Sequence, residues 1–303
     1  MHPIKRVLVG LDLSDIDKVV ISYTSYISDL LDVDKVYFFH VSPNLELPEE
    51  IINKYPNLIA PVDETIEGII QEKINTHFKS KVEVSIEVLE GNAEDKIIRW
   101  SDIKEIDLIV LGKKNKLKGS GLLSNRLAKV AHCSILTVPE EAPPKINKIL
   151  VPVDFSSSSK MAINEAKLIA DKSGATLSLL NVYVVPSGYH TIGKSYEEFA
   201  EIIKEHAQKN AEKFLDSLNI DLDSCEIRLA LDEDSEPSDK IFSEAQNINS
   251  DLVIISSKGR TGLASILLGS VADKVLSYKS HIPVLVLKNK KENLGFIDAL
   301  LRI

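Results

Sequence analysis

The chain repeats itself once along its length. The segment Val7–Ser14 reads VLVGLDLS and returns as Ile149–Ser156, which reads ILVPVDFS, so that Asp12 and Asp154 are 142 residues apart. Three further apolar segments follow in the same order in both halves, at offsets of 141, 144 and 149 residues. A period of about 145 residues is too long for a solenoid repeat and has the size of a whole domain. The sequence therefore predicts a duplicated domain.

Proline and charge mark the boundary between the two halves. Residues 139–145 read PEEAPPK and interrupt the periodic patterns of both halves. Because Pro143 and Pro144 cannot continue a helix, this connection is expected to be exposed and extended. We predict a first domain at 1–139, a linker at 140–145, a second domain at 146–288 and a C-terminal tail at 289–303.

Each half alternates short apolar segments with amphipathic ones. In the second half, strands are expected at 147–153, 176–183, 225–231, 251–256 and 283–287, and helices at 157–173, 194–218, 236–248 and 269–279. The helical segments carry apolar residues at spacings of three and four, and the central strands are continuously apolar, as in a sheet covered on both faces. The alternation predicts an α/β fold with two repeated doubly wound domains, each a five-stranded parallel sheet with helices on both faces.

Charge and hydropathy narrow the class of protein. The 303 residues include 36 Lys and Arg against 45 Asp and Glu, a formal net charge of −9. This acidity argues against a nucleic-acid partner, whose phosphates are usually bound by a basic surface. The sequence shows no apolar run near the roughly 20 residues that a membrane span needs and no signal-peptide pattern. Cys133 and Cys225 are too far apart in sequence to form a disulfide framework or a clustered metal site. A cytoplasmic protein without a membrane partner is predicted.

Glycine, serine and basic residues follow the fourth expected strand of the second half. Ser256–Gly262 reads SSKGRTG, and Gly269–Val271 reads GSV and opens the next helix. Ligands of open parallel sheets bind beyond the carboxyl ends of the strands, where glycine lets backbone N–H groups approach an anion and a helix N-terminus adds donors. Lys258 and Arg260 would neutralise charge, and Ser270 would donate its hydroxyl. The pattern predicts a di- or triphosphate site; the alternative is a glycine loop that leads into an ordinary helix.

These segments resemble the universal stress protein family, and the resemblance covers nearly all of both halves. Nucleotide-binding members carry a glycine, two residues, a second glycine, nine residues, and then glycine followed by serine or threonine. Gly259 and Gly269-Ser270 match this spacing, and Ser256 stands in place of the first glycine. The resemblance implies a tandem member with an adenine-nucleotide alpha-hydrolase-like fold. It also implies ATP or AMP as the ligand, with Mg²⁺ left open as its companion.

The resemblance further implies how the nucleotide lies in the second domain. Asp154 would accept hydrogen bonds from ribose or adenine, although it could also cap the following helix. Val182 would offer backbone groups to the adenine edge, and Pro152 would shape the pocket wall. The complete predicted site consists of Pro152, Asp154, Val182, Ser256, Lys258, Gly259, Arg260, Gly269, Ser270 and Val271.

The first half keeps less of this pattern. Gly112 ends the fourth expected strand, but Asn115 stands where the second glycine belongs, and Gly119-Ser120 is the remnant of the terminal pair. The segment up to the fifth strand is about five residues shorter than in the second half. A run of lysines in this segment is interpreted as a solvated loop. We predict a degenerate first domain whose pocket is empty or differently occupied, with Asp12 acting as a helix cap.

The chemistry of the sequence points to binding rather than turnover. It contains no Gly-x4-Gly-Lys-Ser/Thr loop, no pair of histidines at metal spacing and no acid–base pair, so neither a catalytic residue nor a metal site is predicted. The first hypothesis is a cytosolic stress-response protein that binds ATP or a related adenine nucleotide in its second domain as a regulatory ligand. The alternatives are a nucleotide-free scaffold or small-ligand carrier, and a weak ATPase or self-phosphorylating protein.

The resemblance also implies an assembly. The last strands of the two domains, at Ile135–Val138 and Val284–Leu287, would pair and make the tandem an internal pseudo-dimer. A homodimer of whole chains is the assembly that the sequence leaves open.

Overall fold

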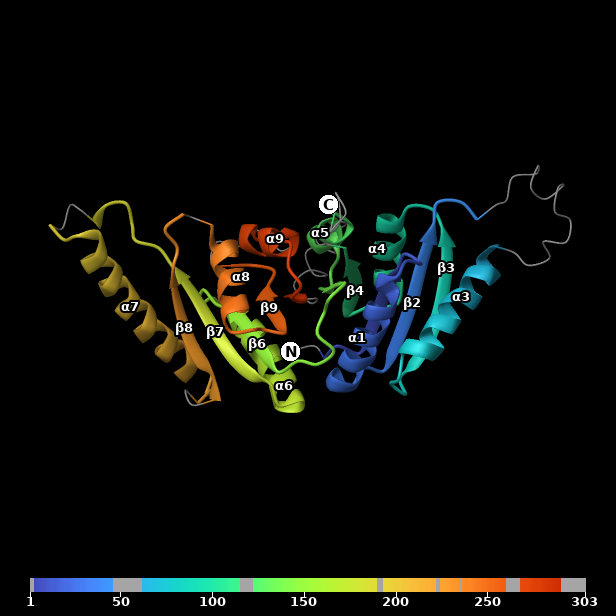
Figure 1. The fold of residues 1–303 in the computed structure, drawn as a ribbon, viewed down its shortest axis with the longest axis horizontal. Coiled ribbons are helices and arrows are strands. Elements are labelled where there is room, and N and C mark those ends of the chain that lie inside the picture. The colour runs from blue at the N-terminus through green and yellow to red at the C-terminus, as the bar shows by residue number, and fades with distance from the viewer. Residues whose placement is uncertain are drawn as a thin grey trace, which may run out of the picture. The chain divides into compact units, whose positions relative to one another are not determined.

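The computed structural model of the chain divides into two compact units, Met1–Pro144 and Lys145–Lys288. It describes residues 3–45, 62–114, 122–189, 193–221, 224–234, 236–259 and 268–289. Each unit has its own set of parallel strands with helices beside them (Figure 1). Each also has its own buried apolar residues. The pairing of the last strands of the two domains stays a prediction.

The first unit alternates strands and helices in chain order. Its elements are β1 (Arg6–Leu11), α1 (Ile16–Leu31), β2 (Lys35–Ser42), α3 (Val62–His77), β3 (Glu83–Glu90), α4 (Ala93–Ile103), β4 (Leu108–Lys113), α5 (Leu122–Val130) and β5 (Ser134–Pro139). The strands lie in the order β3-β2-β1-β4-β5, and their pairings are parallel. The chain order therefore reverses between β1 and β4, which places a crevice at the carboxyl ends of these two strands.

The second unit repeats this arrangement. Its elements are β6 (Lys148–Pro152), α6 (Ser157–Ser173), β7 (Thr176–Tyr183), α7 (Tyr196–Asp216), β8 (Glu226–Leu231), α8 (Pro237–Asn247), β9 (Leu252–Ser256), α9 (Ser270–Ser277) and β10 (Val284–Leu287). The strand order is β8-β7-β6-β9-β10, again with parallel pairings. The predicted fold class, with a five-stranded parallel sheet in each half, is confirmed, and the reversal lies between β6 and β9.

Helices cover both faces of the first sheet. Consecutive residues of a strand point to opposite faces, and two neighbours in β4 meet different helices. Leu111 points to the same side as α4. A Cβ added to Gly10 of the neighbouring strand would lie 2.6 Å from Cδ2 of Leu111 and 3.8 Å from Cδ1 of Ile97, which belongs to α4. Gly112 points to α1, because a Cβ there would lie 3.1 Å from Ile16. On each face the helices pack in pairs, α1 with α3 and α4 with α5.

The ends of α6 show how local sequence sets an element. Ser156 caps its N-terminus, since the Ser156 hydroxyl accepts a hydrogen bond from the Ser159 backbone N–H at 3.2 Å. Gly174 ends the helix in the left-handed conformation, with φ of 75°. The predicted helix at 157–173 is confirmed. No helix in the described part of the chain is long and apolar enough to cross a membrane.

Two glycines of the first unit predict opposite responses to alanine. In Gly112→Ala, the new Cβ would crowd α1, and we expect a loss of about 1–3 kcal/mol in the free energy of unfolding. In Gly68→Ala, the new Cβ meets nothing within 4 Å on the exposed face of α3. We therefore expect a gain of about 0.5–1 kcal/mol from helix propensity. Thermal and urea unfolding of the full chain measure both changes. Equal stabilisation by the two substitutions would show that the packing of α1 on β4 does not require a glycine.

Candidate functional site

The second unit holds a cavity of about 300 Å³ at the carboxyl ends of β6, β7 and β9. Nine of the ten predicted site residues line it: Pro152, Asp154, Val182, Ser256, Lys258, Gly259, Gly269, Ser270 and Val271. The tenth, Arg260, lies outside the described residues. Segments more than 100 residues apart in the sequence are thus brought around one space. The role of each residue in binding stays a prediction.

The Asp154 carboxylate organises the turn between β6 and α6. Its Oδ1 accepts hydrogen bonds from the backbone N–H of Ser156 at 3.1 Å and from the hydroxyl of Ser159 at 2.6 Å. Phe155, which lies between Asp154 and Ser156, has φ of 64°. This left-handed conformation is unfavourable for a residue that has a Cβ, so the surrounding structure must hold Phe155 in it. Since Ser156 is the cap of α6, the alternative that Asp154 caps this helix is wrong. Asp154 shapes the turn that leads into it.

Close approach accounts for the two glycines of the cavity. A Cβ on Gly259 would lie 3.0 Å from Oδ2 of Asp154, and a Cβ on Gly269 would lie 3.3 Å from the carbonyl oxygen of Ser257. Gly269 has φ of −64° and ψ of 150°, which any residue adopts. Its backbone N–H donates to the Ser257 carbonyl at 2.7 Å, and this bond draws the start of α9 against the loop after β9. These positions exclude side chains because of space, with no special demand on backbone conformation.

Ser256 fits the position that the family pattern gives to a glycine. It ends β9 without a positive φ, and its hydroxyl donates to the carbonyl oxygen of Lys258 at 2.8 Å. The serine therefore closes the turn after β9. At the other side of the loop, Gly269 is the N-cap of α9 and has no side chain to cap the first N–H groups. Ser270, the first residue of that helix, is exposed beside them, so these donors face the mouth of the cavity.

One residue of the site region was missed by the sequence analysis. Asn181 in β7 is buried, and its side-chain N–H donates to the carbonyl oxygen of Val153 at 2.8 Å. His40 holds the same place in the first unit, where its Nδ1 lies 2.9 Å from the carbonyl oxygen of Leu11. Both side chains tie the end of one strand to the end of its neighbour. A polar residue at the same position of two apolar repeats was the available signal.

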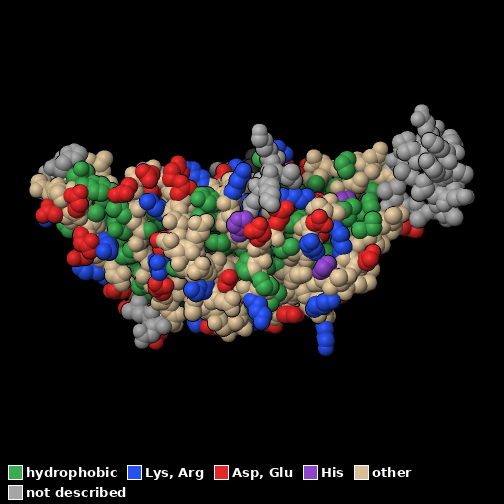
Figure 2. Space-filling view, viewed as in Figure 1, with side chains coloured by type: hydrophobic (Ala, Val, Ile, Leu, Met, Phe, Trp, Pro, Cys, Tyr) green, Lys and Arg blue, Asp and Glu red, His purple; other side chains and the backbone are tan. Residues whose placement is uncertain are grey.

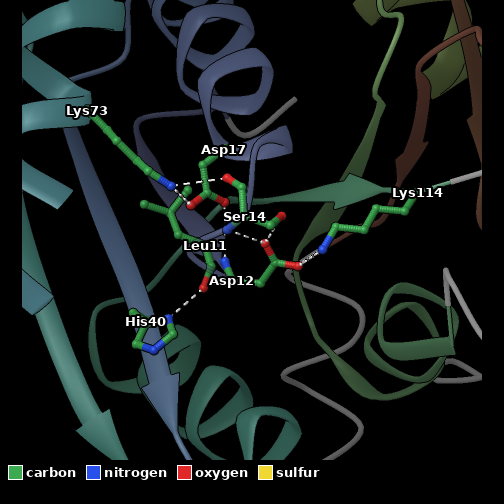
Figure 3. A network of polar contacts seen from close by, with 7 residues as sticks. All are labelled: Leu11, Asp12, Ser14, Asp17, His40, Lys73 and Lys114. Carbon is green, nitrogen blue, oxygen red and sulfur yellow. Dashed lines mark hydrogen bonds and ion pairs between the residues drawn. The ribbon is translucent and has the colours of Figure 1, made fainter. Parts of the chain in front are cut away.

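The first unit holds a larger cavity at the equivalent place. Its volume is about 560 Å³, and it lies at the carboxyl ends of β1, β2 and β4. Asp12 stands at its rim (Figure 3): Oδ1 accepts from the backbone N–H of Ser14 at 3.1 Å and from its hydroxyl at 2.5 Å, and Oδ2 forms an ion pair with Lys114. Burial raises the pKa of Asp12, but the hydrogen bonds from Lys114 and Ser14 outweigh it and hold the pKa below its ordinary value.

Two expectations for this region are wrong. The N-cap of α1 is Asp15, so Asp12 is not a helix cap. The described part of the lysine run is not simply solvated either, because Lys113 is buried and Lys114 is paired with Asp12. Burial lowers the pKa of Lys113 to about 8. The other lysines of the run, Lys116 and Lys118, lie outside the described residues. Asn115 and Gly119-Ser120 lie outside the described residues.

A second carboxylate distinguishes the first unit from the second. Asp17 stands where the second unit has Ser159; its Oδ1 accepts from the Asp12 backbone N–H at 3.2 Å, and its Oδ2 lies 2.7 Å from the Lys73 ammonium. Lys73 also donates to the carbonyl oxygen of Ser14 at 3.0 Å (Figure 3). The Asp17 side chain is 2% exposed, and burial raises its pKa despite the opposing charge of Lys73. Helix α3 therefore supplies the charge that this turn needs.

Removing one member of this ion pair is expected to cost more than removing both. Lys73→Met leaves the Asp17 carboxylate buried without its cation, with an expected loss of about 1–3 kcal/mol in unfolding free energy. Asp17→Ser combined with Lys73→Met restores the residue type of the second unit and should recover at least half of that loss. Thermal unfolding of the two variants measures the difference. Equal losses would mean that the charge of Asp17 is irrelevant to the turn.

The pH dependence of Lys73→Met tests the same contact. Without Lys73 the pKa of Asp17 rises further, so the native state holds a proton that the unfolded chain has released above about pH 4. The loss caused by Lys73→Met should therefore be smaller at about pH 5 than at about pH 8. A loss that grows on acidification would contradict this assignment.

Among the described residues, no group of three His, Cys, Asp or Glu side chains is placed to hold a metal ion. The polar groups of both cavities instead form hydrogen-bonded turns and ion pairs.

Comparison with known proteins gives matches for both units. The family model of the universal stress protein family matches residues 3–139 and 145–288. Universal stress protein MJ0531 of Methanocaldococcus jannaschii is 31% identical over 150 residues, which cover 48% of this chain and 84% of that protein. Universal stress protein YxiE of Bacillus subtilis is 30% identical over 147 residues, which cover 47% of this chain and 99% of that protein. Each of these relatives therefore corresponds to about one unit.

Solved structures resemble the whole chain. The functionally unknown protein PA1789 of Pseudomonas aeruginosa has a TM-score of 0.65 at 17% identity, with 99% of this chain and 98% of that chain covered. A universal stress protein of Archaeoglobus fulgidus has a TM-score of 0.63 at 18% identity, with 95% and 99% covered. At these identities the likeness shows the fold. Together with the match to the family model in both units, it shows that the chain is a tandem member of the universal stress protein family.

Proposed function

We propose that this chain is a cytosolic stress-response protein whose second unit binds ATP or a related adenine nucleotide as a regulatory ligand. The observation that carries the proposal is the convergence of the nucleotide-binding motif on one cavity. The Gly259 loop and the Gly269-Ser270 pair line the same space as Asp154, which lies more than 100 residues earlier in the chain. The start of α9 without a side-chain cap lies beside them, and such helix ends favour phosphate groups.

Charge orients the proposed ligand. The Asp154 carboxylate would repel phosphate, so we assign the nucleoside to the side of Asp154 and Val182. The phosphates are assigned to the start of α9, where Ser270 and backbone N–H groups donate. A cavity of about 300 Å³ lies at the lower limit of small-molecule pockets, which suits an enclosed nucleoside with phosphates extending toward the helix. The half-buried Lys258 supplies positive charge on the loop.

Binding is proposed to be asymmetric between the units. In the first unit the carboxylate equivalent to Asp154 is Asp12, and it is paired with Lys114. A nucleoside would have to displace this lysine before it could bond to the carboxylate. The motif spacing of Gly259 and Gly269 is also lacking in the first half. The nucleotide site is therefore assigned to the second unit alone.

Calorimetric titration with ATP is expected to give one site per chain. Asp12→Asn is the matched control, because it removes the equivalent carboxylate of the first unit and should leave the stoichiometry and the affinity unchanged. Two equivalent sites in the wild-type chain, or a lower stoichiometry in Asp12→Asn, would contradict the asymmetry.

Three variants are expected to separate the two ends of the nucleotide. Asp154→Asn keeps an oxygen acceptor for the turn and removes the charge, so it should weaken adenosine and ATP by similar factors. Gly269→Val should abolish ATP binding and spare adenosine, because its side chain would occupy the tight space beside the Ser257 carbonyl. Ser270→Ala removes one hydroxyl donor to a charged group and should cost ATP about 1.5–3 kcal/mol, or about 10–150-fold in affinity.

A competition series with adenosine, AMP and ATP measures these effects, and circular dichroism checks that each variant is folded. If Asp154→Asn lost only the phosphate-dependent part of the affinity, the ligand would lie in the opposite direction. Normal ATP binding by Gly269→Val would show that the phosphates do not lie at the start of α9.

A further inference from the structure

The larger cavity, in the first unit, is not used by the proposed nucleotide function. Its volume of about 560 Å³ falls within the range of about 300–1,000 Å³ that is typical of pockets for small organic molecules. It opens where the strand order reverses, at the ends of β1 and β4, the usual place for a ligand in such a sheet. Size and position together indicate a binding site, and its lining indicates the chemistry of the ligand.

The charges around this cavity are balanced. Among the described residues, the carboxylates and ammonium groups that line it are those of Asp12, Asp17 and Lys114. Lys114 is paired with Asp12, and Asp17 is paired with Lys73 from α3. An ionised ligand that enters the cavity would lose its hydration and find no unpaired opposite charge among the described lining residues. This desolvation costs free energy. The described lining therefore favours an uncharged molecule.

Apolar side chains form about half of the cavity wall. They include side chains from three helices and two strands, namely Ile16, Phe39, Val41, Ile97, Leu111 and Leu123. A ligand that covers these side chains would remove apolar surface from water, which drives binding. The molecule that fits this lining is uncharged and has a substantial apolar part.

His40 gives the cavity one directional polar group. It is 9% exposed and lines the cavity. Its Nδ1 faces the carbonyl oxygen of Leu11 at 2.9 Å (Figure 3), so in the neutral ring the proton is on Nδ1 and Nε2 is an acceptor. No described residue donates to Nε2. His40 lines the cavity, so a ligand there is placed to donate to this acceptor.

We propose that the cavity of the first unit is a second ligand site, which takes an uncharged small molecule with a substantial apolar part and an N–H or O–H group that donates to Nε2 of His40. This site is chemically distinct from the nucleotide site of the second unit and does not depend on it. The chain would thus combine two pockets of the same descent with different ligand classes.

The probe N-phenyl-1-naphthylamine tests the proposal, because it is uncharged, apolar, carries one N–H group and fluoresces more strongly in apolar surroundings. Titration of the full chain should give saturable binding at one site. Ala93→Trp and Leu123→Trp place a large side chain into the cavity from half-buried positions, and each should weaken the probe at least 10-fold. Pro237→Trp is the matched control, since Pro237 begins α8 as Ala93 begins α4, and it lines the other cavity. It should leave probe binding unchanged.

The hydrogen bond to His40 is tested with a second probe. The N-methylated analogue lacks the donor and should bind the wild-type chain about 2–10-fold more weakly. His40→Asn keeps a side-chain N–H that can donate to the carbonyl oxygen of Leu11, as Asn181 donates to that of Val153. It removes the acceptor from the position of Nε2. The variant should therefore weaken the parent probe by a similar factor and leave binding of the analogue unaffected.

Four results would overturn the proposal: no saturable binding by the wild-type chain, unchanged binding in both tryptophan variants of the first unit, loss of binding in Pro237→Trp, or equal effects of His40→Asn on both probes. Circular dichroism confirms that each variant is folded. None of these outcomes depends on whether the chain binds ATP, so a failure of this site is distinguishable from a failure of the nucleotide proposal.

Discussion

The turn after the first strand of each unit is the constraint on which both cavities depend. An aspartate that follows the strand accepts hydrogen bonds from the residues beyond it, and the intervening residue, Leu13 or Phe155, is held with φ of 63° or 64°. This conformation is unfavourable in isolation, so the carboxylate and its donors must be in place for it to persist. The turn directs the next helix along the sheet and leaves the carboxylate at the edge of the crevice.

One residue of this turn separates the electrostatics of the two units. Ser159 donates a hydrogen bond to Asp154, whereas Asp17 cannot donate to Asp12 and adds a buried negative charge. The first unit offsets its two carboxylates with lysines from α3 and from the end of β4. A fold duplicated in sequence has thereby acquired one cavity bordered by a helix start that suits an anion and one whose charged groups neutralise each other.

Sequence spacing predicted which residues line the cavity of the second unit, but not why those residue types stand there. Gly259 and Gly269 were selected by their separation, and the structure places both where a Cβ would approach Asp154 or a backbone carbonyl. Ser256 departs from the family pattern and still ends its strand regularly. The comparison of the repeats marks Asn181 as a polar residue, but its contact with Val153 joins two strands, and no local pattern reveals such a contact. The same holds for Lys73, which meets Asp17 from 56 residues away.

The sequence by itself determined the duplication, the α/β class and the segments that surround the second cavity. These follow from local periodicity, from residue types at turns and from the constant offset between the halves. Only the tertiary structure decided which charged side chains form ion pairs and how large each cavity is. It also decided which atoms of Asp12, Asp17 and His40 already take part in hydrogen bonds. Those features depend on distances between segments far apart in the chain, and the packing of side chains, rather than their order in the sequence, sets such distances.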